Sequence, residues 1–198
     1  MWDLDKKMTL IKKEIFKDIY LLRKYYSSEE ASFLYDCLFS KISWKQYNVN
    51  VFGKTYPQPR LCSFIADNNV SYTYSKLTLN AEAWTNELYE IREKLKTDFK
   101  LEFNSVLANL YRDGNDSNGW HADNERELGK NPTLLSLSFG GEKALHLRSN
   151  TAKKKILIQN GDLLLFTGKS QHESQHMIAK SKTYTEARIN LTFRNIIV

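Results

Sequence analysis

The chain has 198 residues, which suits one domain with a substantial core and is too short for two comfortable ones. With 29 Lys and Arg against 23 Asp and Glu, its net charge of +6 favours polyanionic partners. Two lone cysteines, Cys37 and Cys62, support neither a disulfide framework nor a zinc site, and no apolar run is long enough to cross a bilayer. We expect no membrane association and an intracellular location in a reducing compartment, cytoplasmic or at the nucleoid in a bacterium and nuclear in a eukaryote.

The N-terminal part predicts a short helix or an extended lead-in over residues 8–26. Ser27 and Ser28 offer hydroxyl caps in front of two acidic residues, which favours a helix from Glu29 to Ser40. Apolar residues recur at helical spacing along this stretch.

A strand is expected over residues 44–52, ended by a turn near Pro57. An Asn-, Ser- and Tyr-rich loop follows over 66–76. Asn80 can cap the next helix, predicted from Ala81 to about Lys96, whose apolar residues form one stripe.

The second half of the chain predicts the β-core, because short alternating segments are separated by glycine-containing turns. The expected strands are 105–111, 120–123, 133–139, 143–148, 155–159, 162–166, 172–178 and 185–194. Eight short strands after two helices indicate a mainly β protein of the α+β class, with a double-sheet jelly roll and the helices packed on one side.

His121 and Asp123 are the first candidate metal ligands, because alternate side chains of an extended segment share a face. A third ligand is expected from residues 171–176, which contain His172 and His176. Two His and one carboxylate on one side of a metal leave the other side open, which is typical of non-haem Fe(II) oxygenases. His-x-Asp also arises by chance, and the alternative is a structural histidine.

Residues 188–194 alternate polar and apolar side chains without interruption. The polar face consists of Arg188, Asn190, Thr192 and Arg194. Guanidinium groups bind carboxylates in bidentate fashion, so this face suits a dicarboxylate, together with Asn109 and Tyr111 on an earlier strand. The alternative is an edge strand with a solvated outer face.

Five separated motifs resemble the AlkB family of Fe(II)- and 2-oxoglutarate-dependent dioxygenases: Asn109-Leu-Tyr-Arg-Asp-Gly114, His121-x-Asp-x-Glu125, Ser136-Leu-Ser-Phe-Gly140, His176, and Arg188-Ile-Asn-Leu-Thr-Phe-Arg194. The likeness covers about residues 51–196 and implies a double-stranded β-helix with Fe(II) on His121, Asp123 and a distal histidine. The family's spacing between that histidine and the last motif assigns His176. His172 remains a neighbour that could contact nucleic acid.

The same resemblance implies 2-oxoglutarate as co-substrate and O2 as oxidant. The residues implied for 2-oxoglutarate are Arg188, Asn190 and Tyr111 at its far carboxylate, and Arg194 and Asn109 near its metal-chelating carboxylate, with Thr192 in support. His146 has no counterpart in these motifs and is expected to be structural. The family chemistry is oxidative demethylation of a base nitrogen, with release of succinate, CO2 and formaldehyde.

A methyl group on the pairing edge of a base is inaccessible inside a duplex, so the substrate must be single-stranded or the base flipped out. The lid that recognises the nucleotide in AlkB proteins corresponds to a stretch that includes residues 72–79. Tyr74 resembles the aromatic that stacks on the base opposite His121, while Tyr72 and Glu125 resemble the groups that read its exocyclic edge. The residues implied for the base are Tyr72, Tyr74, Ser75 and Glu125. The alternative for the tyrosines is ordinary packing under a loop.

Val51-Phe52-Gly53 resembles the finger of the mammalian AlkB homologue that prefers duplex DNA. An exposed apolar wedge can fill the gap that a flipped base leaves in the stack. Phe52 is therefore expected to contact duplex substrate, and the alternative is a core residue at a strand end.

We expect a single dioxygenase domain over 1–198, with an N-terminal extension (1–50), a lid (51–79) and a helix with the jelly-roll core (80–198). The expected function is direct-reversal repair of DNA bases such as 1-methyladenine and 3-methylcytosine, by a monomer, on double- or single-stranded DNA. One alternative is the same chemistry on RNA. Another is a non-catalytic nucleic-acid-binding module with this fold.

Overall fold

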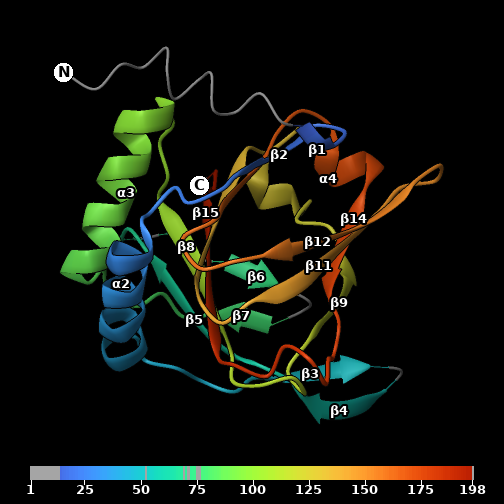
Figure 1. Cartoon of the computed structure of the whole chain (residues 1–198), viewed down its shortest axis with the longest axis horizontal. Helices are drawn as coiled ribbons and strands as arrows, with labels where there is room; N and C mark the ends of the chain where they lie inside the picture. The colour runs from blue at the N-terminus through green and yellow to red at the C-terminus, as the bar shows by residue number, and fades with distance from the viewer. Residues whose placement is uncertain (1–13, 52, 69, 71, 75–76, 198) are drawn as a thin grey trace.

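Two antiparallel β-sheets face each other in this computed structural model, which describes residues 14–51, 53–68, 70, 72–74 and 77–197 (Figure 1). The larger sheet has the order β1 (Glu14–Phe16), β2 (Ile19–Leu22), β13 (Leu163–Phe166), β10 (Leu134–Gly140), β15 (Arg188–Arg194), β8 (Ser105–Tyr111) and β5 (Leu61–Ala66). The smaller sheet has the order β12 (Lys153–Ile158), β11 (Lys143–Arg148), β14 (Gln175–Ile178) and β9 (Asn118–His121). The expected mainly β fold with a jelly-roll core is confirmed.

Strand β15 lies between β10 and β8 in the interior of the larger sheet, and all seven of its residues are buried. Its apolar residues Ile189, Leu191 and Phe193 belong to a core that includes residues of both long helices. A second core lies between the two sheets and includes Leu107 and Leu147. The polar residues of β15 point into the space between the sheets, which places them in the interior of the jelly roll.

The helices α2 (Ser28–Lys41) and α3 (Asn86–Phe99) lie together on one side of the larger sheet, as expected (Figure 1). Helix α2 begins with a capping box, in which the Ser27 side chain accepts from the Glu30 N–H and the Glu30 carboxylate accepts from the Ser27 N–H. No helix within the described part of the chain has both the length and the apolar character that a bilayer crossing requires.

The predicted start of the second helix at Ala81, capped by Asn80, is wrong. The Thr85 side chain caps α3 by accepting from the Leu88 N–H. The segment before it is held extended against β5, because Glu82 exchanges backbone hydrogen bonds with Phe64 and Ala66. Pairing with a neighbouring strand therefore overrides the local helix propensity.

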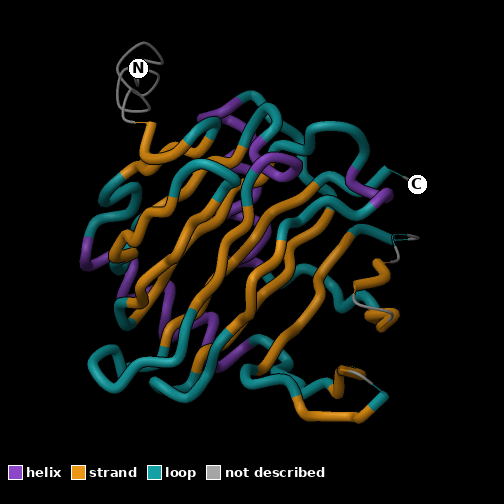
Figure 2. The backbone as a smooth tube through the Cα atoms, turned by 90° about the vertical axis from the view of Figure 1, so that its right-hand side faces the viewer, coloured by secondary structure: helices purple, strands orange, loops and turns teal. Residues whose placement is uncertain are grey.

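Two short hairpins flank the barrel on the same side (Figure 2). One pairs β3 (Asn48–Val51) with β4 (Lys54–Pro57), so the strand predicted from Trp44 begins later. The other pairs β6 (Tyr72–Tyr74), which falls within the predicted loop over 66–76, with β7 (Leu77–Leu79) directly after it. Strand β5, which the sequence did not predict, forms the edge of the larger sheet beside β8.

The structure decides between the two alternatives for the N-terminal lead-in, and two smaller differences concern the ends of predicted strands. The lead-in is extended in its described part, where β1 and β2 pair. The strand predicted over 172–178 begins with a helical turn, α4 (Ser170–Glu173), because the backbone N–H of Ser174 bonds back to Ser170. Strand β9 ends at His121, so Asp123 lies on the loop before the 3₁₀ helix η1 (Arg126–Leu128).

Candidate active site

Three potential metal ligands converge between the sheets. His121 at the end of β9 pairs directly with His176 on β14, and their ring centroids are 4.1 Å apart. Asp123 follows on the adjacent loop, and the ligand atoms of all three side chains lie within 4.8 Å of one another. Two imidazoles and one carboxylate form the donor set that suits Fe(II) in non-haem oxygenases. The residues present therefore fit the metal that the sequence predicted.

The orientation of the His121 ring is fixed by its own strand. Its Nδ1–H donates to the carbonyl oxygen of Gly119 at 2.7 Å. Nε2 is then the nitrogen that faces the other ligands, 4.0 Å from Asp123 Oδ1 and 3.1 Å from Asn118 Nδ2. A hydrogen bond on the far ring nitrogen is the usual way in which proteins orient a metal-binding histidine.

The electrostatics of the cluster favour the metal-binding forms of these side chains. Burial opposes ionisation of Asp123, but Arg194 at 3.1 Å, together with the two histidines, keeps the pKa of this carboxyl well below its usual range. Burial lowers the pKa of His176 to about 3, and the charges of His121 and Arg194 act in the same direction. At neutral pH the cluster therefore offers a carboxylate and a neutral distal imidazole.

Gln171 is a positioning residue that the sequence reasoning did not single out. It is 2% exposed, and its Oε1 accepts from the backbone N–H of Asp123 at 2.9 Å. Because Gln171 lies on α4, directly before the strand with His176, this bond ties together two segments that carry ligands. In the sequence Gln171 stands five residues before His176, and this spacing does not indicate that its side chain contacts the backbone of Asp123.

We expect Gln171→Leu to weaken metal binding by about tenfold, because contacts that orient metal ligands typically contribute 10–100-fold to affinity. Gln171→Glu, which keeps an oxygen acceptor at this position, should bind closer to the wild-type level than Gln171→Leu does. Calorimetric titration with Mn(II), without co-substrate, measures the effect, and Gln159→Leu on the exposed surface is the matched control. Equal Mn(II) affinity in Gln171→Leu and wild type would contradict this role.

The residues predicted for 2-oxoglutarate also come together. On β15 and β8, Arg188 pairs with Tyr111, and Asn190 pairs with Asn109. These four residues line one cavity with Thr192 and Arg194, and the same cavity includes the three potential metal ligands. The structure thus brings all six predicted co-substrate residues beside the His–Asp–His cluster.

Arg188 is the most informative member of this group. It is 3% exposed, its Nη2 donates to Ser138 Oγ at 2.7 Å, and its guanidinium lies 5.6 Å from the centre of the Tyr111 ring. Its buried Nε has no hydrogen-bond partner, and among the described residues no carboxylate forms an ion pair with it. A buried cation without a counterion is costly. The site therefore fits a ligand that brings its own carboxylate, such as 2-oxoglutarate.

The floor of the cavity is held by hydrogen bonds between neighbouring strands. Asn190 Nδ2 donates to Ser136 Oγ at 2.8 Å, and Thr192 Oγ1 donates to Asn190 Oδ1 at 3.2 Å. Asn109 Oδ1 accepts from Arg60 Nε at 2.9 Å. Arg60 also lines the cavity, although the sequence analysis did not place it in the site.

The predicted substrate residues are described less completely. Phe52 and Ser75 lie outside the described residues, and Tyr72 and Tyr74 are described only as the ends of β6. The half-buried Glu125 lies on the loop between Asp123 and η1.

The two remaining histidines lie outside the cluster. His172 is exposed on α4, and His146 lies on β11, opposite Lys155 on β12 and Met177 on β14. The structure therefore brings together the metal and co-substrate residues, and leaves the predicted base contacts as a hypothesis.

Fold and site together define an iron-dependent oxygenase architecture, and the comparison with known families agrees. The family model of the 2OG-Fe(II) oxygenase superfamily matches residues 18–194, and the chain belongs to this superfamily. The predicted cofactors, Fe(II), 2-oxoglutarate and O2, follow from that membership.

Relatives within the superfamily confirm the AlkB resemblance. The chain is 33% identical over 180 residues to human alpha-ketoglutarate-dependent dioxygenase alkB homolog 3, which covers 85% of this chain and 62% of the relative. It is 32% identical over 160 residues to human DNA oxidative demethylase ALKBH2, which covers 76% and 61%. The chain thus spans about 60% of the length of these relatives, and the near-equal identities do not separate the two.

Solved structures support the fold. That of OsALKBH1 superposes with a TM-score of 0.66 at 15% identity, over 92% of this chain and 99% of that one. An oxidoreductase of the 2OG-Fe(II) oxygenase family from Burkholderia pseudomallei gives a TM-score of 0.60 at 10% identity, over 99% and 93%.

Proposed function

We propose that the chain is a dioxygenase that removes alkyl groups from base nitrogens of nucleic acid, with 1-methyladenine and 3-methylcytosine in DNA as the expected lesions. The observation that carries this is the His121–Asp123–His176 cluster beside a buried Arg188 that has no counterion among the described residues. The 32% identity to human DNA oxidative demethylase ALKBH2 supports the substrate class.

In this proposal each group of residues has a separate task. His121, Asp123 and His176 hold Fe(II), and Arg188, Asn190 and Tyr111 bind the far carboxylate of 2-oxoglutarate. Arg194 and Asn109 lie near the end of the co-substrate that faces the metal, with Thr192 supporting Asn190. Bound iron and 2-oxoglutarate supply the oxidation of an N-methyl group by O2, which yields succinate, CO2, formaldehyde and the unmodified base. The protein's contribution is to orient these groups and to exclude competing reactions.

The base is presented to this centre by residues of the lid and the adjoining loop. A flipped or single-stranded base would stack on Tyr74 opposite His121, with Tyr72, Ser75 and Glu125 around its exocyclic edge. The pairing of β6 with β7 supports this role, because a hairpin provides a more defined position for the two tyrosines than the predicted loop would.

The test of the function is incubation of a 1-methyladenine oligonucleotide with the chain, Fe(II), 2-oxoglutarate and O2, followed by mass spectrometry. We expect a mass loss of one methylene per lesion, with succinate formed in equal amount. No product would contradict the proposal. An anaerobic titration with Fe(II) and 2-oxoglutarate then identifies the non-catalytic alternative, because a nucleic-acid-binding module would give no charge-transfer band.

Duplex DNA is the substrate form that Val51-Phe52-Gly53 favours, and RNA is the alternative because its modified bases are often splayed out. In sequence Phe52 follows Val51, the last residue of β3, and its own placement lies outside the described residues. We expect Phe52→Ala to lower activity on duplex DNA about tenfold relative to single strands, because the gap left by the flipped base is no longer filled.

The ratio of initial rates on the two substrates measures this effect. Phe33→Ala is the matched control, since Phe33 is 67% exposed on α2, which lies across the molecule from the β3–β4 hairpin (Figure 1). An unchanged ratio in Phe52→Ala would show that Phe52 is no wedge and would favour single strands or RNA.

We also propose that residues 1–198 form one catalytic domain, with an extension (1–50), a lid (51–79) and the core (80–198), and that it acts as a monomer inside the cell. The hydrophobic cores on both sides of the larger sheet support a single domain, because each includes residues from the lid or extension and from the core.

A further inference from the structure

Strand β9 carries an extra residue where it meets β14. His121 pairs with His176. Asn118 pairs with Ile178, so three steps along β9 match two steps along β14. An inserted residue of this kind is a β-bulge, and it changes which side chains of a strand share a face. The bulge therefore turns Asn118 to the same side as His121, and Asn118 lines the cavity that contains the His–Asp–His cluster.

The side-chain amide of Asn118 meets the nitrogen of His121 that faces the other ligands. Asn118 Nδ2 lies 3.1 Å from His121 Nε2, while Nδ1 of the same ring bonds to the carbonyl oxygen of Gly119. An amide nitrogen can only donate, so this contact uses the lone pair of Nε2. A metal ion would need the same lone pair, at a distance of about 2.1 Å. The amide and a metal therefore exclude each other at His121.

The surroundings of Asn118 are poor in other acceptors for a displaced amide. Across the sheet, Asn118 is followed by Ile178 and then by Leu145, and both of these are apolar core residues. Two amide oxygens that line the cavity already accept hydrogen bonds from neighbouring side chains. The nearby carboxylate, Asp123, is a potential metal ligand itself. A donor left without an acceptor is unfavourable, so the site favours a metal-bound ligand that brings its own oxygen atoms.

The co-substrate 2-oxoglutarate is such a ligand, because its carboxylates only accept hydrogen bonds. The residues predicted to bind it line the same cavity as Asn118. We propose that Asn118 couples two binding steps: its amide holds His121 before the metal binds, and afterwards donates to the metal-chelating end of 2-oxoglutarate. This inference rests on the metal and co-substrate sites of the proposed function. Its consequence is an order of binding, in which the co-substrate restores the hydrogen bond that the metal displaces.

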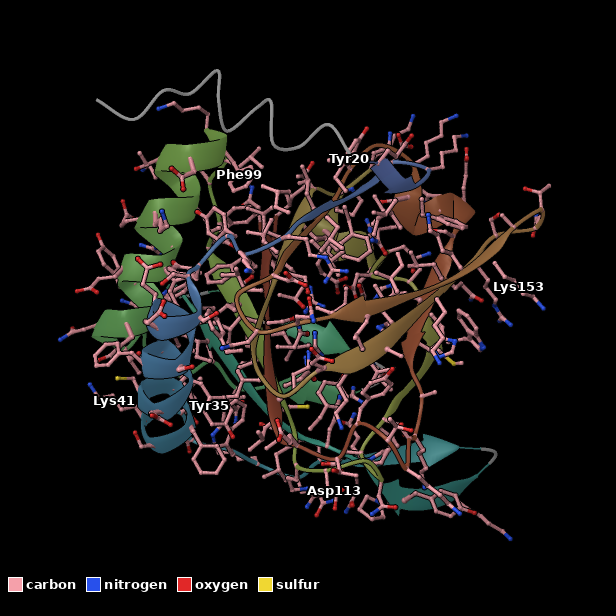
Figure 3. All side chains as sticks on the ribbon, in the orientation of Figure 1. Tyr20, Tyr35, Lys41, Phe99, Asp113 and Lys153 are labelled. Carbon is pink, nitrogen blue, oxygen red and sulfur yellow. The ribbon has the colours of Figure 1, made fainter. Side chains whose placement is uncertain are left out.

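Asn118→Leu tests both steps, because leucine is close to asparagine in size and neither donates nor accepts. Calorimetric titration of the metal-free chain with Mn(II) measures the first step, and titration of the Mn(II)-loaded chain with 2-oxoglutarate measures the second. Asn115→Leu is the matched control. Asn115 is exposed, and its amide donates to Asp113 at 3.4 Å, on a loop in the lower part of the molecule in Figure 3.

We expect Asn118→Leu to bind Mn(II) about fivefold more tightly, because the metal no longer displaces a hydrogen bond. The loaded variant should bind 2-oxoglutarate about tenfold more weakly, because hydrogen bonds to charged groups are stronger than those between neutral groups. Asn118→Ala, which adds no bulk beside the metal, should shift both affinities in the same directions. General damage to the site would weaken both steps, so the opposite signs identify the role of the amide.

An unchanged or weaker Mn(II) affinity in both variants would overturn the inference. So would a 2-oxoglutarate affinity in the loaded variants equal to that of the wild type. A wild-type chain that does not bind Mn(II) would contradict the proposed metal site, and the inference with it. Wild-type binding of both ligands with unchanged variants would contradict the role of Asn118 alone.

Discussion

Asp123→Ala is expected to lower demethylation at least about 1000-fold, because the metal loses its only carboxylate ligand and the remaining imidazoles hold Fe(II) weakly. The structure adds a second consequence. Asp123 lies 3.1 Å from Arg194, and both are buried, so the variant leaves a buried charge without this partner. We expect a loss of about 3 kcal/mol in the free energy of unfolding of the metal-free protein.

Succinate formation per folded molecule, with folding followed by circular dichroism, measures the first effect, and denaturant unfolding measures the second. Asp113→Ala, which removes an exposed carboxylate from a nearby loop, is the matched control and should change neither. DNA affinity should remain near the wild-type value, since Asp123 is buried away from the surface. Turnover above one tenth of the wild-type rate would show that Asp123 is not a ligand.

Arg188→Met is expected to raise the KM for 2-oxoglutarate on the order of 100-fold, because it removes the charge that the far carboxylate would meet. Unlike Asp123→Ala, this variant should leave the free energy of unfolding of the metal-free protein nearly unchanged. Arg188 is buried and has no ion pair among the described residues, so an apolar side chain of similar length costs the metal-free protein little.

Initial rates at increasing 2-oxoglutarate, and calorimetry of 2-oxoglutarate with the Mn(II)-loaded chain, check this prediction independently. Arg126→Met in the exposed part of η1 is the control with the same chemical change. An unchanged 2-oxoglutarate affinity in Arg188→Met would show that the buried charge of Arg188 does not bind the carboxylate of the co-substrate. A large decrease in the melting temperature of the variant would instead show that Arg188 has a structural role.

The alternation in residues 188–194 predicted which side chains share a face, and the strand β15 has that arrangement over its whole length. The same rule grouped Asn109 with Tyr111 on β8. The cap and apolar stripe that predicted a helix from Ala81 placed its start too early, because the backbone of Glu82 pairs with β5 and the helix begins at Asn86. Local patterns hold where no distant segment competes for the same backbone groups.

Gln171 shows more clearly which contacts local sequence patterns cannot predict. No neighbour in sequence indicates that its side chain meets the backbone of Asp123, 48 positions away. The hairpin of β6 with β7 was hidden for a related reason, since its Asn-, Ser- and Tyr-rich surroundings are typical of a loop. Contacts of this kind depend on how the strands before and after them are placed.

Local sequence patterns were enough to predict the strand faces, the overall jelly-roll class and the chemical types of the ligands, because a two-residue repeat and motif spacing depend only on near neighbours. The three-dimensional arrangement was needed to show that His121 and His176 pair across two strands, and that Arg188 is buried with no carboxylate paired to it in the described chain. These properties depend on the register between strands far apart in the chain, which turns and core packing set.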